Sequence, residues 1–181
     1  MSFIIETERL GMREFEPGDA EEFFALCTNP EVMRYIPGED VPPTVEAMRQ
    51  KILNYPDYKK HGFGRWSCIP KKTGRFIGFT GLKRLEDFGD EVDLGYRFFP
   101  EFWGQGIATE AGLPCIEYGF EVLELDRIIG FAIPENVASI RVLEKCGMTV
   151  ERFTAYDKID RLALYSIASA AFDGQRIQRP E

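Results

Sequence analysis

Two glycines separated by one residue, Gly104 and Gly106, stand between a predicted strand and a predicted helix. A helix N-terminus carries unpaired backbone N–H groups and about half a positive charge, and glycines before it let the backbone approach an anion closely. Small residues follow the second glycine, as close packing around a bound anion requires. We therefore predict a pyrophosphate site made by the backbone N–H groups of Gly104, Gln105, Gly106, Ile107, Ala108 and Thr109.

Other interpretations of this glycine pair stay open at this point. A dinucleotide-binding turn needs the pattern G-x-G-x-x-G, but its third glycine position is Thr109 here. A Walker loop needs a Gly-Lys-Ser/Thr ending, which does not follow Gly106. The simplest alternative is a turn between strand and helix that happens to contain glycine.

The composition limits the classes of protein to consider. The chain has 181 residues, of which 44% are hydrophobic, so it can form one globular domain with a sizeable core. Its net charge of -8 argues against a nucleic-acid partner. Because we find neither a signal peptide nor an apolar run of ~20 residues, we expect no membrane association and a cytoplasmic location.

Cysteine and histidine are too few and too scattered for a zinc site. Cys27, Cys68, Cys115 and Cys146 lie far apart, and His61 is the one histidine. We therefore expect no metal, four inert core thiols and a solvated loop at His61.

Hydrophobic periodicity and turn residues predict the elements that position the glycine pair. Helices are expected at 17–29, 44–55, 106–123 and 135–147, with a short helical turn at 30–38. Strands are expected at 9–15, 65–70, 75–82, 91–99, 127–133, 149–156 and 161–169. This order predicts a mixed α/β (α+β) fold, with a single domain over residues 1–169 and a C-terminal tail over 170–181.

Four segments in a fixed order carry a resemblance to a known family. They read ETERLGMREFEPGDAEEFFALCTNPEVMRYIPG, TGRFIGFTGL, VDLGYRFFPEFWGQGIATEA and PENVASIRVLEKCGM. Over residues 5 to about 169, the chain resembles the GNAT superfamily of acetyl-CoA-dependent N-acetyltransferases. Within it, the chain is similar to the ribosomal-protein N-terminal (alanine/serine) and spermidine-type acetyltransferases.

The resemblance implies a fold and a reaction. The GNAT fold has a central, mostly antiparallel, splayed sheet flanked by helices. Acetyl-CoA would be the co-substrate, with no metal. The acceptor would be a primary amine, on a protein N-terminus or a small molecule, and the protein could form a homodimer.

The resemblance also implies cofactor-binding residues. The pantetheine arm would lie along a splayed strand edge beside Arg97, Phe98 and Phe99, with the N–H of Phe98 or Phe99 facing the thioester oxygen. The alternative for the two phenylalanines is core packing. Asn136 matches the family asparagine that bonds the same arm, and its alternative is a helix cap. Trp103 replaces the usual Gln or Arg of the phosphate loop.

The catalytic residues are implied in the same way. Asp93 matches a frequent acidic position and would serve as the base, and Glu91 shares its strand face. Leu143 occupies the usual position of the acid tyrosine, so Ser139 would assist the departing thiolate, with Tyr156 as a second candidate. The alternatives are a solvated strand face and an ordinary serine in the first turn of a helix.

Three functions compete on this sequence. The first is an active N-acetyltransferase, whose acceptor pocket the segment 38–50 would shape, with Glu39, Asp40 and Glu46 attracting a cationic amine or simply forming a solvated face. The second is a non-catalytic acyl-CoA-binding or sensing module on the same fold. The third, a nucleotide-dependent oxidoreductase, is disfavoured by the missing third glycine.

Overall fold

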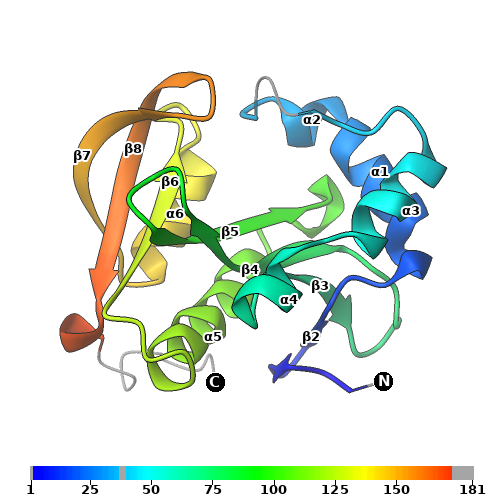
Figure 1. Cartoon of the computed structure of the whole chain (residues 1–181), viewed down its shortest axis with the longest axis horizontal. Coiled ribbons are helices and arrows are strands. Elements are labelled where there is room, and N and C mark those ends of the chain that lie inside the picture. Colours follow the sequence, from blue (N-terminus) through cyan, green and yellow to red (C-terminus); the bar gives the residue numbers. More distant parts are fainter. Residues whose placement is uncertain (1, 37–39, 173–181) are drawn as a thin grey trace.

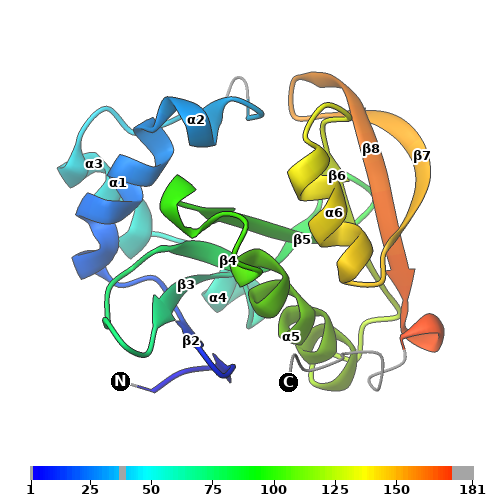
Figure 2. The ribbon, with the colours of Figure 1, turned by 180° about the vertical axis from the view of Figure 1, so that it is seen from behind.

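One eight-stranded sheet organises the part of the chain that the computed structural model describes, residues 2–36 and 40–172. Its strands are β1 (Ile5–Glu6), β2 (Leu10–Arg13), β3 (Arg65–Pro70), β4 (Gly78–Leu85), β5 (Glu91–Phe98), β6 (Arg127–Ala132), β7 (Thr149–Tyr156) and β8 (Ile159–Ala168). The α-helices are α1 (Ala20–Thr28), α2 (Pro30–Met33), α3 (Val45–Leu53), α4 (Asp57–His61), α5 (Ile107–Glu121) and α6 (Val137–Lys145). Short 3₁₀ turns are η1 (Pro17–Asp19), η2 (Pro100–Phe102) and η3 (Ser169–Ala171). Helices α5 and α6 cover one face of the sheet, and α4 lies on the other (Figures 1 and 2).

The strand order is β1-β2-β3-β4-β5-β6-β8-β7, and every neighbouring pair except β5 and β6 is antiparallel. Strands β4 and β5 pair along the whole of β5, whereas β5 and β6 are in register at a single pair, Asp93 and Ile129. Beyond that pair the two parallel strands diverge (Figure 1). The predicted mostly antiparallel, splayed sheet is therefore confirmed, and α5 is the crossover that parallel strands require.

Among the described residues, the predicted elements agree with the structure in type and order, with three differences; the predicted helical turn at 30–38 and tail at 170–181 lie partly outside the described residues. Strand β4 begins at Gly78 rather than at residue 75, because Phe76 packs against Phe23 in the cluster beneath α1. The two-residue β1 and the five-residue α4 were not predicted, since neither is long enough to show a period. His61 ends α4 with a side chain only 12% exposed, so the prediction of a solvated loop at this residue was wrong.

Apolar side chains cover both faces of the central strands. Trp66, Leu82, Leu94 and Ile116 belong to the core shared with α5 and α6. A second cluster, including Met48, fills the space between the sheet and helices α1 and α3. Val92, Leu94 and Phe98 of β5 belong to the first of these cores, so β5 cannot shift without opening it and is a rigid support.

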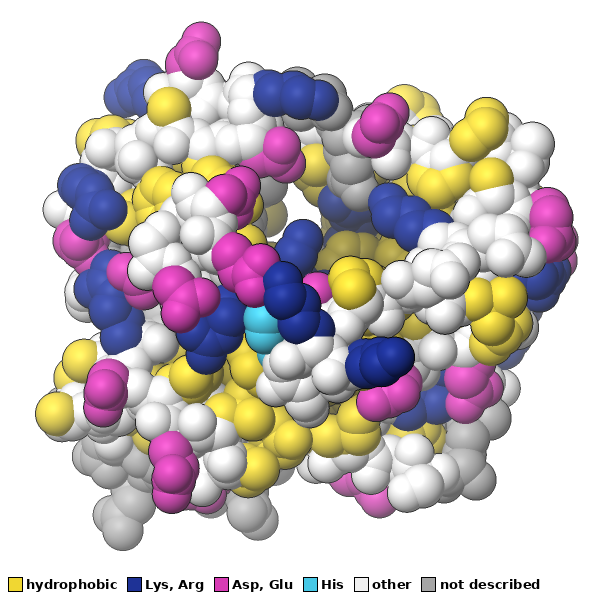
Figure 3. Space-filling model, viewed as in Figure 1, with side chains coloured by type: hydrophobic (Ala, Val, Ile, Leu, Met, Phe, Trp, Pro, Cys, Tyr) yellow, Lys and Arg dark blue, Asp and Glu magenta, His cyan; other side chains and the backbone are white. Residues whose placement is uncertain are grey.

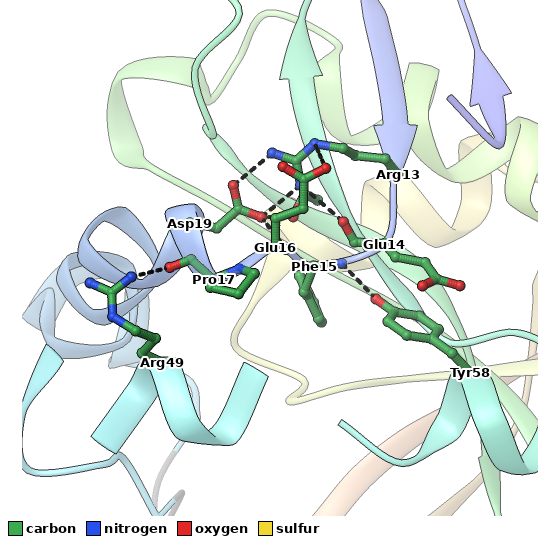
Figure 4. Close-up of polar contacts among 9 residues, drawn as sticks. Arg13, Glu14, Phe15, Glu16, Pro17, Asp19, Arg49 and Tyr58 are labelled. Atoms are coloured by element: carbon green, nitrogen blue, oxygen red, sulfur yellow. Dashed lines mark hydrogen bonds and ion pairs between the residues drawn. The ribbon is translucent and has the colours of Figure 1, made fainter. Parts of the chain in front are cut away.

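A buried ion pair fixes the beginning of α1 against the sheet (Figure 4). The guanidinium of Arg13 on β2 donates to both carboxylate oxygens of Asp19, over 2.7 and 2.8 Å. Ser67 of β3 and the backbone N–H of Glu16 donate to the same carboxylate. Burial alone would raise the pKa of Asp19, but the hydrogen bonds from Arg13, Glu16 and Ser67 outweigh it and hold that pKa below its usual range.

Candidate active site

The glycine pair forms a left-handed turn at the start of α5. Gly104 and Gly106 have φ angles of +71° and +75°, which glycine adopts without a steric penalty. The first intrahelical hydrogen bond runs from the N–H of Glu110 to the carbonyl of Gly106, over 2.9 Å. The N–H groups of residues 107–109 therefore have no acceptor within the helix and point out of its N-terminus.

Space in front of this turn is open among the described residues. A Cβ atom added at Gly104 would meet nothing within 4 Å, and one at Gly106 would meet only the Nη2 atom of Arg9, at 3.8 Å. The side chain of Gln105 turns away to donate to the carbonyl of Glu101. Left-handed glycines, unpaired helix N–H groups and open space fit a pyrophosphate group.

A clamp that the sequence did not predict holds this turn in place. Glu110, in the first turn of α5, accepts hydrogen bonds from the Thr7 hydroxyl and from the backbone and guanidinium of Arg9. Arg9 also donates to the carbonyl of Gln105, over 3.1 Å. Burial raises the pKa of Glu110, but the bonds from Thr7 and Arg9 outweigh it, so this pKa lies below its usual range. Because about one hundred residues separate the partners, no local sequence signal could have found the clamp.

The free edge of β5 presents one of the two backbone N–H groups proposed to face the thioester oxygen. The N–H of Phe99 donates to the carbonyl of Ile77, on the side of β4. Because backbone groups alternate in direction along a strand, the N–H and carbonyl of Phe98 point the other way, toward the diverging β6. The indole of Trp103 reaches the Phe98 carbonyl from that side, over 2.8 Å. Phe98 is therefore the residue whose backbone faces the opening.

The side chains of Arg97, Phe98 and Phe99 contact other parts of the protein. Arg97 lies over the ring of Phe79 and donates to the Sγ atom of Cys27, on the side of α1. Phe98 is buried in the core under α5, and Phe99 packs against the cluster beneath α1 and α3. The core packing considered for Phe98 and Phe99 is thus observed, and the backbone is the part of the edge open to a ligand.

A cavity of about 230 Å³ lies where β5 and β6 diverge. Its lining comprises Tyr35, Ile36, residues 93–96, residues 131–133, Asn136, Ser139, Tyr156, Asp157, Ile159 and Leu162. Figure 3 shows the surface hollowed between the two halves of the molecule, with acidic and basic side chains around the hollow. The cavity unites Asp93, Asn136 and Ser139, three predicted site residues that lie far apart in the sequence.

Asp93 lines this cavity, and its carboxylate is paired with the guanidinium of Arg65 on β3. The Arg65 guanidinium donates to the Asp93 carboxylate and, over 2.8 Å, to the Asp93 carbonyl. Gly95 makes this reach across the sheet possible, because a Cβ atom there would lie 2.5 Å from the Cζ atom of Arg65. Glu91, by contrast, does not line the cavity: both its oxygens lie 3.2 Å from the Nε atom of Arg127.

The start of α6 supplies the polar groups opposite β5. Asn136 is the helix N-cap, since its Oδ1 atom accepts from the N–H of Ser139 over 3.1 Å. The Oγ atom of Ser139 lies 3.0 Å from the hydroxyl of Tyr96. Leu143 is 1% exposed and fills the core, so no hydroxyl occupies the usual tyrosine position.

Tyr156, the second candidate acid, stands at another wall of the cavity. Its ring stacks on Phe131, with centroids 5.3 Å apart, and its hydroxyl donates to Asp87 over 3.0 Å. Burial, together with Asp87, raises the pKa of Tyr156 to about 12. The hydroxyl is therefore engaged with a carboxylate outside the lining of the cavity.

Two of the three acidic residues proposed to attract the acceptor, Asp40 and Glu46, do not line this cavity. Glu46 is exposed on α3 and bonds Arg49 and Gln50, and Asp40 is exposed but does not line the cavity. Glu39 falls outside the described residues. Tyr35 and Ile36, just before the segment 38–50, do line the cavity.

Two further findings concern the described part of the chain. All four cysteines are buried thiols outside any disulfide, and no group of three His, Cys, Asp or Glu side chains there could hold a metal ion. No helix in residues 2–36 or 40–172 is long and apolar enough to cross a bilayer.

Comparisons with known proteins agree with this architecture. Residues 9–149 match the family model described as acetyltransferase (GNAT) domain. The Bacillus subtilis (strain 168) protein named uncharacterized N-acetyltransferase YoaA is 33% identical over 148 residues, which cover 82% of this chain and 84% of that protein. A solved GNAT-family acetyltransferase from Bacillus anthracis superposes with a TM-score of 0.77 at 28% identity, covering 92% of this chain and 98% of that one.

A second solved structure shows the fold alone, because its sequence has diverged further. The ribosomal-protein-S5-alanine acetyltransferase from Vibrio fischeri superposes with a TM-score of 0.77 at 22% identity, covering 91% of this chain and 96% of that one. The family match spans well over half of the chain and includes the β5–α5 segment with its glycine pair. The chain therefore belongs to the GNAT family of acetyl-CoA-dependent N-acetyltransferases.

Proposed function

We propose that this protein transfers the acetyl group of acetyl-CoA to a primary amine, whose nitrogen attacks the thioester carbonyl carbon directly. The observation that carries the proposal is the cavity between β5 and β6. It joins Asp93, Asn136 and Ser139 beside the open edge of β5. A base, an amide and a hydroxyl thus surround one space that an acyl group and an amine could share.

The chain offers a binding group for each part of the donor, which supplies an acetyl group already activated as a thioester. The N–H groups of residues 107–109 and the turn at Gly104 and Gly106 suit the pyrophosphate. The exposed edge of β5 suits the pantetheine arm, which would add to the sheet through main-chain hydrogen bonds. Asn136 uses its Oδ1 atom as the helix cap, so its amide nitrogen would be the group offered to that arm.

Two groups would stabilise the charges that develop during transfer. The N–H of Phe98 would donate to the thioester oxygen as it becomes negative, and one such donor contributes ~2.7–4 kcal/mol to lowering a barrier. The Ser139 hydroxyl would donate a hydrogen bond to the departing thiolate. Ser139 lines the cavity, and Phe98 lies two residues beyond Tyr96, the last residue of β5 in its lining.

Asp93 would accept the proton that the amine loses, directly or through water. An α-amine, with a pKa near 8, is ~10% neutral at pH 7, whereas a lysine amine, with a pKa near 10.4, is only ~0.04% neutral. The α-amine therefore demands less of a base that is already paired with Arg65. We propose a protein N-terminus as the first acceptor to test and a small-molecule amine as the second.

Binding and turnover test the proposal separately. Saturating acetyl-CoA, at 100 times its dissociation constant, should add ~2.7 kcal/mol of stability and raise the Tm by roughly 5–10 °C, whereas NADH should not. Release of the CoA thiol is then measured with N-terminal peptides, polyamines and amino sugars as acceptors. Stabilisation without thiol release for any amine would indicate the non-catalytic acyl-CoA-binding module instead.

Variants assign the roles. Ser139→Ala should keep the stabilisation by acetyl-CoA but lower kcat, because the hydroxyl would act only on the departing thiolate. Ser169→Ala, at an exposed serine in η3, is the matched control and should leave both quantities unchanged. An unchanged kcat in Ser139→Ala would remove Ser139 from the mechanism.

A further inference from the structure

Tyr96 holds a second hydroxyl group in the cavity, and none of the roles above uses it. It lies on β5, three residues after Asp93, and its ring faces the start of α6. Its oxygen is 3.0 Å from the Oγ atom of Ser139 and 2.9 Å from the Ser139 carbonyl oxygen. Tyr96 therefore contacts the residue proposed to assist the thiolate.

The chemistry of the three oxygens limits how hydrogens can be shared. The Ser139 carbonyl can only accept, whereas each hydroxyl can donate one hydrogen and accept others. If Tyr96 donates to the Oγ atom, the Ser139 hydrogen is released toward the cavity. If Tyr96 donates to the carbonyl instead, the Ser139 hydrogen can turn back to the phenol oxygen. A negative sulfur in the cavity favours the first arrangement, because hydrogen bonds to charged acceptors are the stronger ones.

Tyr96 keeps its own hydrogen in this exchange. Burial raises the pKa of its phenol above the ordinary value near 10, although the hydrogen bond with Ser139 acts in the other direction. A thiol titrates well below that, near 8.5 for cysteine, so proton transfer from the phenol to a thiolate runs uphill. Tyr96 is suited to donate a hydrogen bond and not a proton.

We infer, on the basis of the proposed function, that Tyr96 is a positioning residue that turns the Ser139 hydroxyl hydrogen toward the departing sulfur. As the C–S bond breaks, its electron pair goes to sulfur, and Ser139 donates a hydrogen bond to that charge. Tyr96 donates to the Ser139 oxygen at the same moment, which makes the serine a stronger donor. The amine loses one proton to Asp93, which passes it to solvent, and the departing thiolate takes up one proton from solvent, so the protons balance.

The position of Leu143 gives this pair its significance. The usual tyrosine would stand on α6, but Leu143 fills that place with a buried side chain. Tyr96 brings a phenol to the same cavity from β5 instead of α6, and its oxygen lies 3.0 Å from the Oγ atom of Ser139. Strand β5 and helix α6 thus each supply one hydroxyl group: Ser139 would contact the departing sulfur, and Tyr96 would contact Ser139.

The test compares Tyr96→Phe, Ser139→Ala and the double variant in thiol release from acetyl-CoA. Tyr96→Phe should lower kcat about tenfold, with the KM for acetyl-CoA within about twofold, because the lost bond acts on the leaving group and not on binding. The double variant should be no slower than Ser139→Ala alone, since Tyr96 acts through that serine. Tyr118→Phe, on α5 and packed against Trp66, is the control and should match the wild type.

A tyrosine that merely ties β5 to α6 would give a different result. Its loss would lower the Tm, and its effect on kcat would add to that of Ser139→Ala. Equal kcat in Tyr96→Phe and the wild type, or additive losses, would overturn the inference and leave the proposed function standing. A wild type that binds acetyl-CoA but acetylates no amine would overturn both.

A second variant keeps the ring, the hydroxyl and the fold. Replacing Tyr96 with 3,5-difluorotyrosine makes the phenol more acidic, so it loses its hydrogen at a lower pH. If a protonated Tyr96 is required, the alkaline limb of the kcat profile should move to lower pH. An unmoved limb, with activity retained where the fluorinated phenol is ionised, would overturn the inference.

Discussion

Gly95→Ala should weaken the ion pair that anchors the proposed base. The extended backbone conformation at Gly95 is one that any residue can adopt, but an added Cβ atom would lie 2.5 Å from the Cζ atom of Arg65. Such a contact is too short to exist, so the guanidinium, the end of a flexible side chain, must shift away from Gly95. The shift would weaken its bonds to the Asp93 carboxylate and to the carbonyls of Asp93 and Gly81.

The magnitude follows from the burial of the pair. The side chains of Arg65 and Asp93 are 13% and 12% exposed, so separating them leaves a carboxylate without its partner in a mostly dry site. Removing one member of a buried pair destabilises a protein by about 3–5 kcal/mol, which is the loss expected for Arg65→Met and the upper bound for Gly95→Ala, where the arginine is only displaced. For a domain of this size, that is a fall in Tm of roughly 6–20 °C.

The assay is urea denaturation of the wild type, Gly95→Ala, Arg65→Met and the double variant. Because both single changes act on the same interaction, their losses should not add: the double variant should resemble Arg65→Met. Gly18→Ala is the control, since a Cβ at Gly18 would meet nothing within 4 Å, and it should change the free energy of unfolding by less than ~1 kcal/mol. A loss below ~1 kcal/mol in Gly95→Ala, or additive losses, would refute this account of the pair.

Three further predictions concern the supports of the site. The pKa of Asp19 is lower in the folded than in the unfolded state, where it is near 3.9. The contribution of Asp19 to stability is therefore complete above the unfolded pKa and is lost as the pH falls through the folded pKa. Urea denaturation below pH 5 should show this loss in the wild type, and Asp19→Asn should show a flatter dependence of the free energy of unfolding on pH. Gly106→Ala places a side chain at a φ of +75° and should lower the free energy of unfolding by ~1–2 kcal/mol while raising the Kd for acetyl-CoA, measured by calorimetry. Glu110→Gln should weaken the clamp to Arg9 and raise the same Kd with little change in kcat, and a Kd equal to that of the wild type would show that the clamp is not needed for binding.

The sequence by itself determined the longer elements and the glycine turn, because both depend on residues that are neighbours along the chain, whereas the short β1 and α4 were not predicted. The caps at Thr44 and Asn136 and the left-handed Gly106 follow from short-range geometry that neighbouring residues impose. Segment order and motif spacing also indicated the GNAT fold and its splayed sheet. Strand β7, at residues 149–156, has the bounds that periodicity predicted.

Only the tertiary structure decided which groups share the cavity. The partnership of Arg65 with Asp93 crosses β4, the clamp on Glu110 joins positions about one hundred residues apart, and Tyr96 meets Ser139 from another element. The direction of each side chain depends on strand register and on the divergence of β5 from β6. These are long-range properties of the packed sheet, so no spacing along the chain could reveal them.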